Sequence, residues 1–231
     1  MLTGNGSPRA RLVIAAAHRK GGSGKTTLSI NLAAAAHLDG LRTVLVDMDA
    51  QGSAMEWSAA RSEGSPLEGL SVCVGVTRDP DKRVAAARLR ELTDGYDVAI
   101  LDCPARSAEL TLSAAIFADV VVIPIAQGPL DVWAVGQTKE SLDLADLARG
   151  ERGPARRLWV LNNADTWVLT SEAEQALRDD HSAAFGGIVH HRAAFPRAIL
   201  RGESVLTSRA GLRARSEIRK LWRRVKKGRS E

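Results

Sequence analysis

The sequence predicts an α/β fold, in which a doubly wound and mostly parallel sheet carries helices on both faces. Seven apolar runs of strand length alternate with helical stretches along the 231 residues. Hydrophobicity within these runs is continuous rather than alternating, which is typical of strands buried on both faces of a parallel sheet. Helices between parallel strands make right-handed crossovers and so cover both faces. The runs occupy residues 12–17, 43–47, 70–74, 96–102, 119–124, 157–161 and, most weakly, 187–189.

Length and composition indicate one globular domain. Hydrophobic residues make up 45% of the chain and charged residues 26%, an ordinary balance for such a domain. No apolar run reaches the roughly 18–20 residues of a membrane-spanning helix, and the N-terminus lacks the apolar segment of a secretory signal. We therefore expect a disordered lead-in over residues 1–10, a single domain over 11–231, and a basic C-terminal helix at about 210–228.

A glycine-rich loop lies between the first apolar run and the helical pattern of residues 28–38. Strand, glycine loop and helix in this order are what a phosphate-binding loop requires. The glycines let successive backbone N–H groups point at one anion, and the N-terminus of the following helix adds unpaired amides. Lys25 supplies an ammonium group for the β- and γ-phosphates, and the Thr26 hydroxyl is a suitable Mg²⁺ ligand. The expected nucleotide-binding residues of the loop are Lys20, Gly21, Gly22, Ser23, Gly24, Lys25, Thr26 and Thr27.

The start of this loop departs from the usual G-x-x-x-x-G-K-[ST] pattern, because Arg19 stands at the position of its first glycine. Lys20 begins the segment Lys-Gly-Gly-Ser-Gly-Lys-Thr-Thr, which resembles the deviant Walker A motif of the ParA/MinD family of ATPases. The resemblance implies a P-loop NTPase fold with ATP and Mg²⁺ as ligands. It also implies that Lys20 acts in trans on the phosphates bound by a partner subunit, while Lys25 acts in cis. The alternative is that Lys20 is an ordinary solvated loop lysine.

Two carboxylates follow the second apolar run, in the segment Asp47-Met-Asp49-Ala-Gln-Gly-Ser. This segment is similar to the D-x-D-P-Q-G-S segment of the ParA branch, with Ala50 in place of the proline. The resemblance implies that Asp49 positions or activates the attacking water and that Asp47 supports the metal. The alternative is that both carboxylates cap the helix that follows.

Further candidates follow two other apolar runs. Asp102 ends a run in the manner of a Walker B aspartate, which holds Mg²⁺ directly or through water. Asn162 matches the place where relatives offer an asparagine to the adenine, and a plain turn residue is the alternative. Because the carboxyl ends of parallel strands share one edge of the sheet, these side chains are expected at the ligand-binding edge.

Positive charge is concentrated near the C-terminus. Residues 213–229 carry a net charge of +8, which leaves −3 for the rest of a chain whose total is +5. Such a distribution suggests a polyanionic partner, either nucleic acid or an anionic membrane. Apolar residues at helical spacing form a stripe in this segment, and basic residues cover the other faces. The stripe consists of Ile218, Leu221, Trp222 and Val225.

Three interpretations of this helix stay open. It could pack its stripe on the sheet and present arginines to DNA phosphates, lie on anionic lipid, or carry a merely solvated charged face. In family members of similar length the last helix completes the fold, which favours the first interpretation and disfavours a membrane. The candidate DNA-binding residues are Arg192, Arg197, Arg201, Arg219 and Arg223.

The resemblance covers the chain from Leu12 to about Val225 and is strongest to the small plasmid partition proteins of the ParA branch (ParF-like). It implies a homodimer with two ATP molecules at its interface, which binds DNA without sequence preference. Lys20, Lys25 and Asp49 would be the catalytic residues. Hydrolysis would be weak and stimulated by a small ParB/ParG-like centromere-binding partner, so that plasmid or chromosomal DNA is segregated. The expected location is cytoplasmic and nucleoid-associated.

Other members of the family suggest other functions. ParA-like relatives position protein cargo such as chemoreceptor arrays or carboxysomes. MinD-like relatives are ATPase switches that bind to a membrane. Metabolic relatives include iron–sulfur reductases, small-molecule ligases and bacterial tyrosine kinases. Cys73 and Cys103 are poorly placed for a cluster shared by two subunits. The single tyrosine, Tyr96, argues against the tyrosine kinases.

Overall fold

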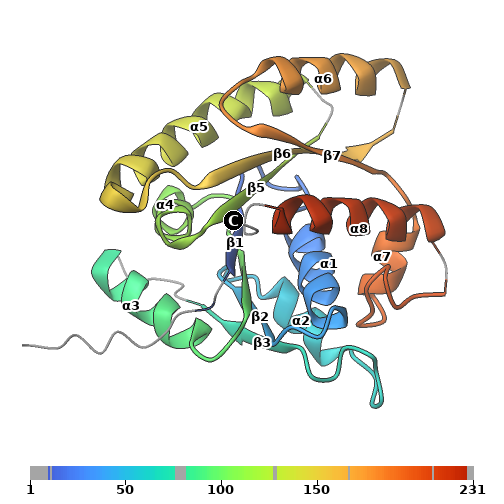
Figure 1. Ribbon diagram of the computed structural model, residues 1–231. Helices are drawn as coiled ribbons and strands as arrows, with labels where there is room; N and C mark the ends of the chain where they lie inside the picture. Colours follow the sequence, from blue (N-terminus) through green and yellow to red (C-terminus); the bar gives the residue numbers. More distant parts are fainter. Residues whose placement is uncertain are drawn as a thin grey trace, which may run out of the picture.

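A sheet of seven strands forms the centre of the molecule (Figure 1). The computed structural model describes residues 10, 12–75, 82–126, 129–165, 167–209 and 211–227. Its strands are β1 (Leu12–Ala16), β2 (Thr43–Asp47), β3 (Ser71–Val74), β4 (Val98–Asp102), β5 (Val120–Ile125), β6 (Arg156–Ala164) and β7 (Ala184–His190). They are hydrogen-bonded in the order β3-β2-β4-β1-β5-β6-β7, and every neighbouring pair is parallel. The predicted α/β fold class is thereby confirmed.

Helices cover both faces of this sheet (Figure 1). They are α1 (Lys25–Leu38), α2 (Ser53–Ala59), α3 (Lys82–Thr93), α4 (Ala108–Phe117), α5 (Pro129–Arg149), α6 (Trp167–Asp179), α7 (Ala194–Ile199) and α8 (Leu212–Lys226), with a short 3₁₀ helix at Gly150–Arg152. Helices α1, α2, α7 and α8 share a hydrophobic core with one face of the sheet, and α3 to α6 share another with the opposite face. None of the described helices is long and apolar enough to cross a membrane.

Strand β1 shows why the apolar runs are continuous. Leu12 and Ile14 belong to the core on the α1 side, whereas Val13 and Ala15 belong to the core on the α4 side. Neighbouring residues of a strand point to opposite faces of the sheet. Because helices cover both faces, each position of the strand requires an apolar residue.

Some predicted segments differ in extent from the structure. The weak seventh strand, expected at residues 187–189, extends over Ala184–His190. This edge strand is only partly buried and its register against β6 is irregular, which weakens its sequence pattern. The basic helix expected at about 210–228 is α8, Leu212–Lys226. The lead-in expected at residues 1–10 lies outside the described residues except for Ala10, which is buried.

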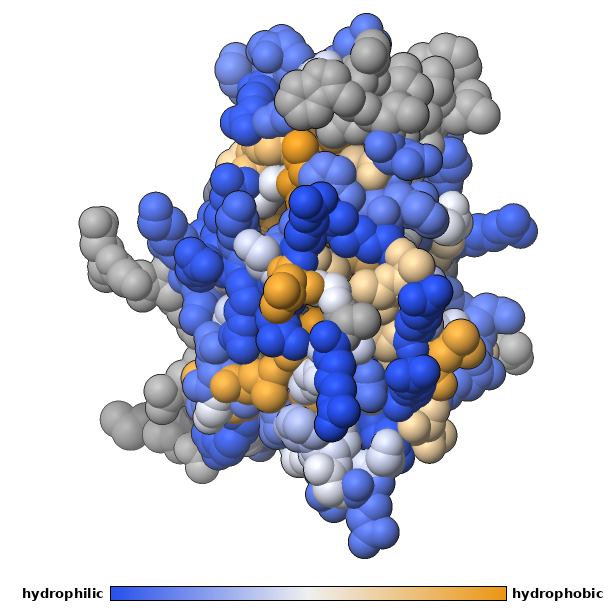
Figure 2. Space-filling view, turned by 90° about the vertical axis from the view of Figure 1, so that its right-hand side faces the viewer, coloured by the Kyte–Doolittle hydropathy of each residue, from blue (hydrophilic) through white to orange (hydrophobic). Residues whose placement is uncertain are grey.

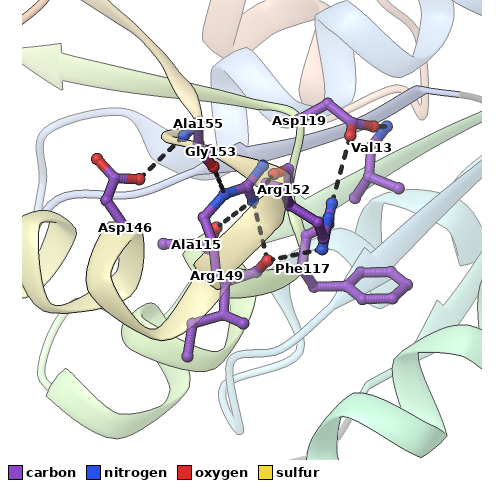
Figure 3. A network of polar contacts seen from close by, with 11 residues as sticks. Val13, Ala115, Phe117, Asp119, Asp146, Arg149, Arg152, Gly153 and Ala155 are labelled. Carbon is purple, nitrogen blue, oxygen red and sulfur yellow. Dashed lines mark hydrogen bonds and ion pairs between the residues drawn. The ribbon is translucent and has the colours of Figure 1, made fainter.

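A buried arginine holds together the turn that leads from α4 into β5 (Figure 3). The Arg149 guanidinium donates hydrogen bonds to the carbonyl oxygens of Ala115, Ile116 and Ala118. Its Nε also donates to the carbonyl oxygen of Gly153 at 2.7 Å. The last carbonyl groups of a helix have no partner within the helix, and a cation there also meets the negative end of the helix dipole. Arg149 therefore fixes the end of α4 to the end of α5.

Replacing Arg149 by alanine should lower the free energy of unfolding by about 3 kcal/mol, because several buried carbonyl groups would lose their donor. Chemical denaturation followed by circular dichroism measures this loss. Arg88→Ala is the matched control, since Arg88 forms an exposed ion pair with Glu91 and should contribute less than about 1 kcal/mol. A loss no larger than that of the control would contradict the stabilising role of Arg149.

Candidate functional site

The glycine-rich loop connects β1 to α1. Gly22 and Gly24 have φ angles of 75° and 89°, a conformation that glycine adopts without strain. Helix α1 begins at Lys25, and no side chain caps its first amides. These amides, together with those of the loop, are therefore suited to bind an anion.

Gly24 also leaves room for a side chain from β6. A Cβ atom at this position would lie 2.1 Å from Nδ2 of Asn162. Asn162 is buried and donates a hydrogen bond from Nδ2 to the carbonyl oxygen of Ser23 at 2.7 Å. The asparagine singled out in the sequence therefore holds the phosphate loop itself, beside any contact it makes with a base.

Lys25 folds back over the loop. Its Nζ donates a hydrogen bond to the carbonyl oxygen of Lys20 at 3.1 Å. Burial lowers the pKa of the Lys25 ammonium, while the charges of Asp102, Cys103 and Asp49 oppose this shift. The ammonium group is thus held inside the loop, close to carboxylates that follow two other strands.

Asp102 ends β4 and pairs in register with Ala16, the last residue of β1. Its Oδ1 accepts a hydrogen bond from Ser29 at 3.0 Å, whereas Oδ2 is buried and has no hydrogen-bond partner among the described residues. Burial raises the pKa of Asp102 to about 7. A hydrogen bond from Thr26 opposes this rise, and the negative charge of Asp47 adds to it. A buried carboxylate oxygen without a donor is a suitable ligand for a divalent cation. Asp102 and Thr26 therefore fit the Mg²⁺ that a bound nucleotide would bring.

Asp47 and Asp49 follow β2 and lie in different surroundings. The buried Asp47 carboxylate accepts hydrogen bonds from the backbone amides of Ala54 and Met55 at 2.9 and 3.2 Å. It also accepts one from the amide of Asp49 at 3.1 Å. These are the contacts expected if Asp47 caps α2, and its role at a metal stays a prediction. Asp49 is half-buried and lies close enough to Lys25 to influence its pKa.

A cavity of about 430 Å³ adjoins the loop, and two histidines in its wall were not predicted from the sequence. Asn162 lines it together with three consecutive residues at the end of β7, which are His190, His191 and Arg192. Glycines of the loop and apolar side chains of α7 complete the wall, and a base and a sugar fit such a mixed surface. Two histidines at the carboxyl end of a strand are the signal that could have identified it, because ligands bind at that edge.

Arg192, a predicted DNA contact, has a different environment from the other candidates. Its side chain is half-buried, lines the cavity, and forms an ion pair with Glu217 at 2.7 Å. The strand before it ends at the ligand-binding edge of the sheet, and this position brings Arg192 beside the loop. The structure therefore places Arg192 in the wall of the cavity beside the loop.

A smaller cavity of about 300 Å³ lies at the start of the loop. Three cationic residues line it, namely Arg19, Lys20 and Arg106. Arg106 is exposed and forms no ion pair with any described residue. No role was predicted from the sequence for Arg19 or Arg106. Arg19 precedes Lys20 directly in the chain, whereas Arg106 lies beside Lys20 only because two separate loops pack together.

Helix α8 packs its apolar stripe into the core. Ile218, Leu221, Trp222 and Val225 are at most 2% exposed. They join the same core as α1, which confirms that the stripe packs on the sheet, while the contact of this helix with DNA stays a prediction. A helix that lies on lipid needs an exposed apolar face, and the stripe of α8 is not available for that purpose.

The remaining DNA candidates lie at the surface. Arg197, Arg201 and Arg223 are exposed, whereas Arg219 forms an ion pair with Asp39 at 2.8 Å. Seen from the side of α7, the described surface is mostly hydrophilic, with small separate hydrophobic areas (Figure 2). Three of the candidate arginines are therefore accessible to a polyanion.

This combination of fold and site defines a P-loop nucleotide-binding protein: a parallel doubly wound sheet, a glycine-rich loop between β1 and α1, and an acidic residue at the end of the neighbouring β4. The family model described as "CobQ/CobB/MinD/ParA nucleotide binding domain" matches residues 14–205. The chain therefore belongs to this family, among the ParA/MinD-type ATPases, and the resemblance read from its two-lysine loop is confirmed.

Individual relatives agree with this assignment. The chain is 33% identical over 216 residues to the maintenance of carboxysome distribution protein A of Gloeobacter kilaueensis, a match that covers 92% of this chain and 91% of that protein. It is 29% identical to the protein of the same name from Halothiobacillus neapolitanus, a match that covers 92% of this chain and 95% of that protein. It is 38% identical to the chromosome-partitioning ATPase Soj of Thermus thermophilus, with 48% of this chain and 53% of Soj covered. The match thus spans about half the length of Soj.

Solved structures share the fold. The cell division ATPase MinD of Pyrococcus furiosus superimposes with a TM-score of 0.71 at 18% identity, covering 94% of this chain and 99% of MinD. A complex of Cyanothece McdA with ATP gives a TM-score of 0.72 at 16% identity, covering 94% of this chain and 96% of McdA. At these identities the likeness shows the fold alone.

Proposed function

We propose that this chain is a ParA-type ATPase that dimerises with ATP, binds DNA without sequence preference, and segregates plasmid or chromosomal DNA. A small ParB/ParG-like centromere-binding partner would stimulate its weak hydrolysis and release it from the nucleoid. The observation that carries the proposal is the loop from Lys20 to Thr27, with a lysine on each side of its glycines and Asp102 beside it. Membership of the family supports ATP hydrolysis.

The residues around the loop would bind and orient ATP without reacting with it covalently. Loop amides bind the phosphate oxygens, and Lys25 neutralises the β- and γ-phosphates. Asp49 orients the attacking water, a role supported by its position near Lys25. Mg²⁺, held by Thr26 and Asp102, would neutralise charge between the phosphates. No group of three or more His, Cys, Asp or Glu in the described part of the chain could hold a metal, so further ligands would come from ATP and water.

The lysine at the start of the loop supports a dimer. By the family resemblance, Lys20 acts on phosphates bound by the partner subunit. The cavity beside it gathers Arg19, Lys20 and Arg106, and three cationic residues on one wall attract the phosphates of a nucleotide. In a dimer two such walls would face each other, so the negative charge of two bound nucleotides would favour association. ATP is therefore the dimerisation switch in this proposal.

Exposed arginines supply the DNA contact in this proposal. Arg197 and Arg201 lie in and just after α7, and Arg223 lies in α8. Binding to phosphates through such cations is independent of base sequence and falls steeply with salt. A membrane switch of the MinD kind is disfavoured, because the apolar stripe of α8 is buried in the core.

The iron–sulfur alternative is disfavoured by the surroundings of the cysteines. Burial raises the pKa of both the Cys73 and the Cys103 thiols. A cluster is held by thiolates, and a buried apolar environment opposes their formation.

Positioning of a protein cargo is a second candidate function. The two carboxysome-distribution relatives match over 92% of this chain, whereas Soj matches over 48%. A cargo-positioning ATPase would use the same dimer and the same DNA contact with a different partner. Partner-stimulated hydrolysis separates the two functions. Stimulation by a centromere-binding protein supports segregation, and stimulation by a cargo adaptor supports positioning.

Retention on nonspecific duplex DNA tests the shared switch. The purified protein is passed over immobilised DNA at near-physiological salt with ATP or with ADP. We expect retention with ATP alone, weakened by added salt and abolished by both Lys20→Ala and Lys25→Ala. Equal retention with both nucleotides would indicate a basic surface without a switch, and no retention would exclude the DNA contact. Either result contradicts the proposal.

A further inference from the structure

Glu217 joins the basic helix α8 to the cavity beside the phosphate loop. Its carboxylate forms hydrogen bonds with Nδ1 of His190 at 2.8 Å and with Nη2 of Arg192 at 2.7 Å. The backbone amide of His190 donates to it as well, at 3.2 Å. Both partners line the cavity of about 430 Å³. One carboxylate in the second turn of α8 therefore fixes two residues of the cavity wall.

This contact differs from an ordinary surface ion pair. The Glu217 side chain is only 14% exposed and that of Arg192 26% exposed, so water screens their attraction less than at the surface. Glu217 is also the only acidic residue of α8, whereas Arg213, Lys220 and Arg223 are exposed. The helix thus directs its one negative charge to the cavity wall and several positive charges to solvent.

A second contact ties the start of α8 to the same wall. A Cβ atom at Gly211 would lie 2.9 Å from Cβ of Ala194, the first residue of α7. Helix α7 lines the cavity through Phe195 and Ile199. The residue that precedes α8 therefore lies directly against the start of α7, which is a second point of contact between α8 and the cavity wall.

We propose that Glu217 is a positioning residue that couples occupancy of the cavity to the basic helix α8. A nucleoside in the cavity contacts the wall that His190 and Arg192 form and restricts the motion of these two side chains. Because Glu217 is bonded to both, the motion of α8 is restricted as well. Nucleotide binding thereby orders the helix that carries the DNA-facing cations, and Arg192 serves the nucleotide site. The coupling rests on the proposed function, which places a nucleoside in the cavity and DNA on α8.

Hydrogen exchange of the whole protein tests this coupling without DNA. Exchange of the α8 amides, relative to those of β4, is measured by mass spectrometry with and without ATP in the wild type and in Glu217→Ala. The matched control is Glu203→Ala, since Glu203 is half-buried near α7 and does not line the cavity. In the wild type and the control, ATP should slow α8 exchange about tenfold. Glu217→Ala should lose this response.

A merely structural role makes a different prediction. It would lower thermal stability equally with and without ATP and leave the response of α8 intact, which would overturn the coupling. Glu217→Gln keeps the size of the side chain and one acceptor oxygen, and it serves as a second variant that retains the fold. It should show a reduced response of α8, and a full response in this folded variant would likewise overturn the coupling.

DNA retention separates failure of the coupling from failure of the proposed function. If wild-type α8 responds to ATP but DNA retention is the same with ATP and ADP, the proposed function fails and the coupling stands. If the wild type binds DNA only with ATP and Glu217→Ala does so equally well, the coupling fails and the proposed function stands. We expect Glu217→Ala to lose most of the difference in retention between the two nucleotides.

Discussion

Replacing Lys25 by alanine should lower the rate of ATP hydrolysis at least about a hundredfold and abolish ATP-dependent dimerisation. The hydrogen bond from its Nζ to the carbonyl oxygen of Lys20 holds the ammonium group within the loop. Without it, the β- and γ-phosphates would lose the cation that the loop supplies in cis. Phosphate release measures the rate, and titration with a fluorescent ATP analogue measures binding. A variant with wild-type hydrolysis would contradict the assignment of the phosphate loop.

The comparison with Lys20→Ala separates the two lysines. If Lys20 acts across a dimer interface, the dilute monomeric variant should bind the fluorescent analogue as tightly as the wild type. At higher concentration it should fail to form the ATP-dependent dimer in sedimentation experiments. Weakened binding by the monomer would show that Lys20 acts in cis. An unaltered dimer would show that Lys20 is a solvated loop residue.

Replacing Asp102 by asparagine should stabilise the nucleotide-free protein at pH 8 and remove Mg²⁺-dependent hydrolysis. Burial raises the pKa of Asp102 from 3.8 to about 7. When folding raises the pKa of a group, the group's contribution to stability is complete at pH values below its pKa in the unfolded protein. The contribution is lost as pH rises through its pKa in the folded protein. For Asp102 the loss between pH 4 and pH 8 is at most about 4 kcal/mol. The charge that the metal site requires therefore destabilises the empty protein.

Thermal melts in a chelator at pH 5 and pH 8 measure this effect. The wild type should lose stability relative to Asp102→Asn as pH rises, and Mg²⁺ with ATP should stabilise the wild type alone. Asp39→Asn is a control for which the expected change in stability at high pH has the opposite sign. Burial opposes ionisation of Asp39, but hydrogen bonds from Lys226 and Trp222 prevail and lower its pKa. That variant should therefore be less stable at pH 8. Parallel pH profiles for the wild type and Asp102→Asn would contradict the prediction.

The fold and the phosphate site could be predicted from the sequence because both depend on local patterns. A strand buried on both faces needs continuous apolar residues, and α/β alternation then predicts a parallel sheet covered by helices. The loop from Lys20 to Thr27 carries its chemistry in glycine spacing and in its place between a strand and a helix. Asp102 was recognisable for the same reason, since it ends an apolar run.

Side chains that act through distant partners could not be assigned in this way. An arginine has the same sequence signature whether it faces solvent, DNA or a carboxylate. Arg192 appears in the sequence as one basic residue among several, and only the packing of α8 beside β7 brings Glu217, 25 residues later, to its guanidinium. Arg106 reaches the wall beside Lys20 for a similar reason, because two loops far apart in the chain meet there.

The sequence by itself determined the succession of strands and helices along the chain, the phosphate loop and the apolar stripe of α8, since periodicity and glycine spacing act over a few neighbouring residues. Tertiary structure alone decided which charged groups share a cavity wall and where the stripe of α8 packs. Such contacts join segments that are distant in the chain. Their energies depend on burial and on separations of a few ångströms, and these quantities exist only after the sheet and its two helical layers have packed.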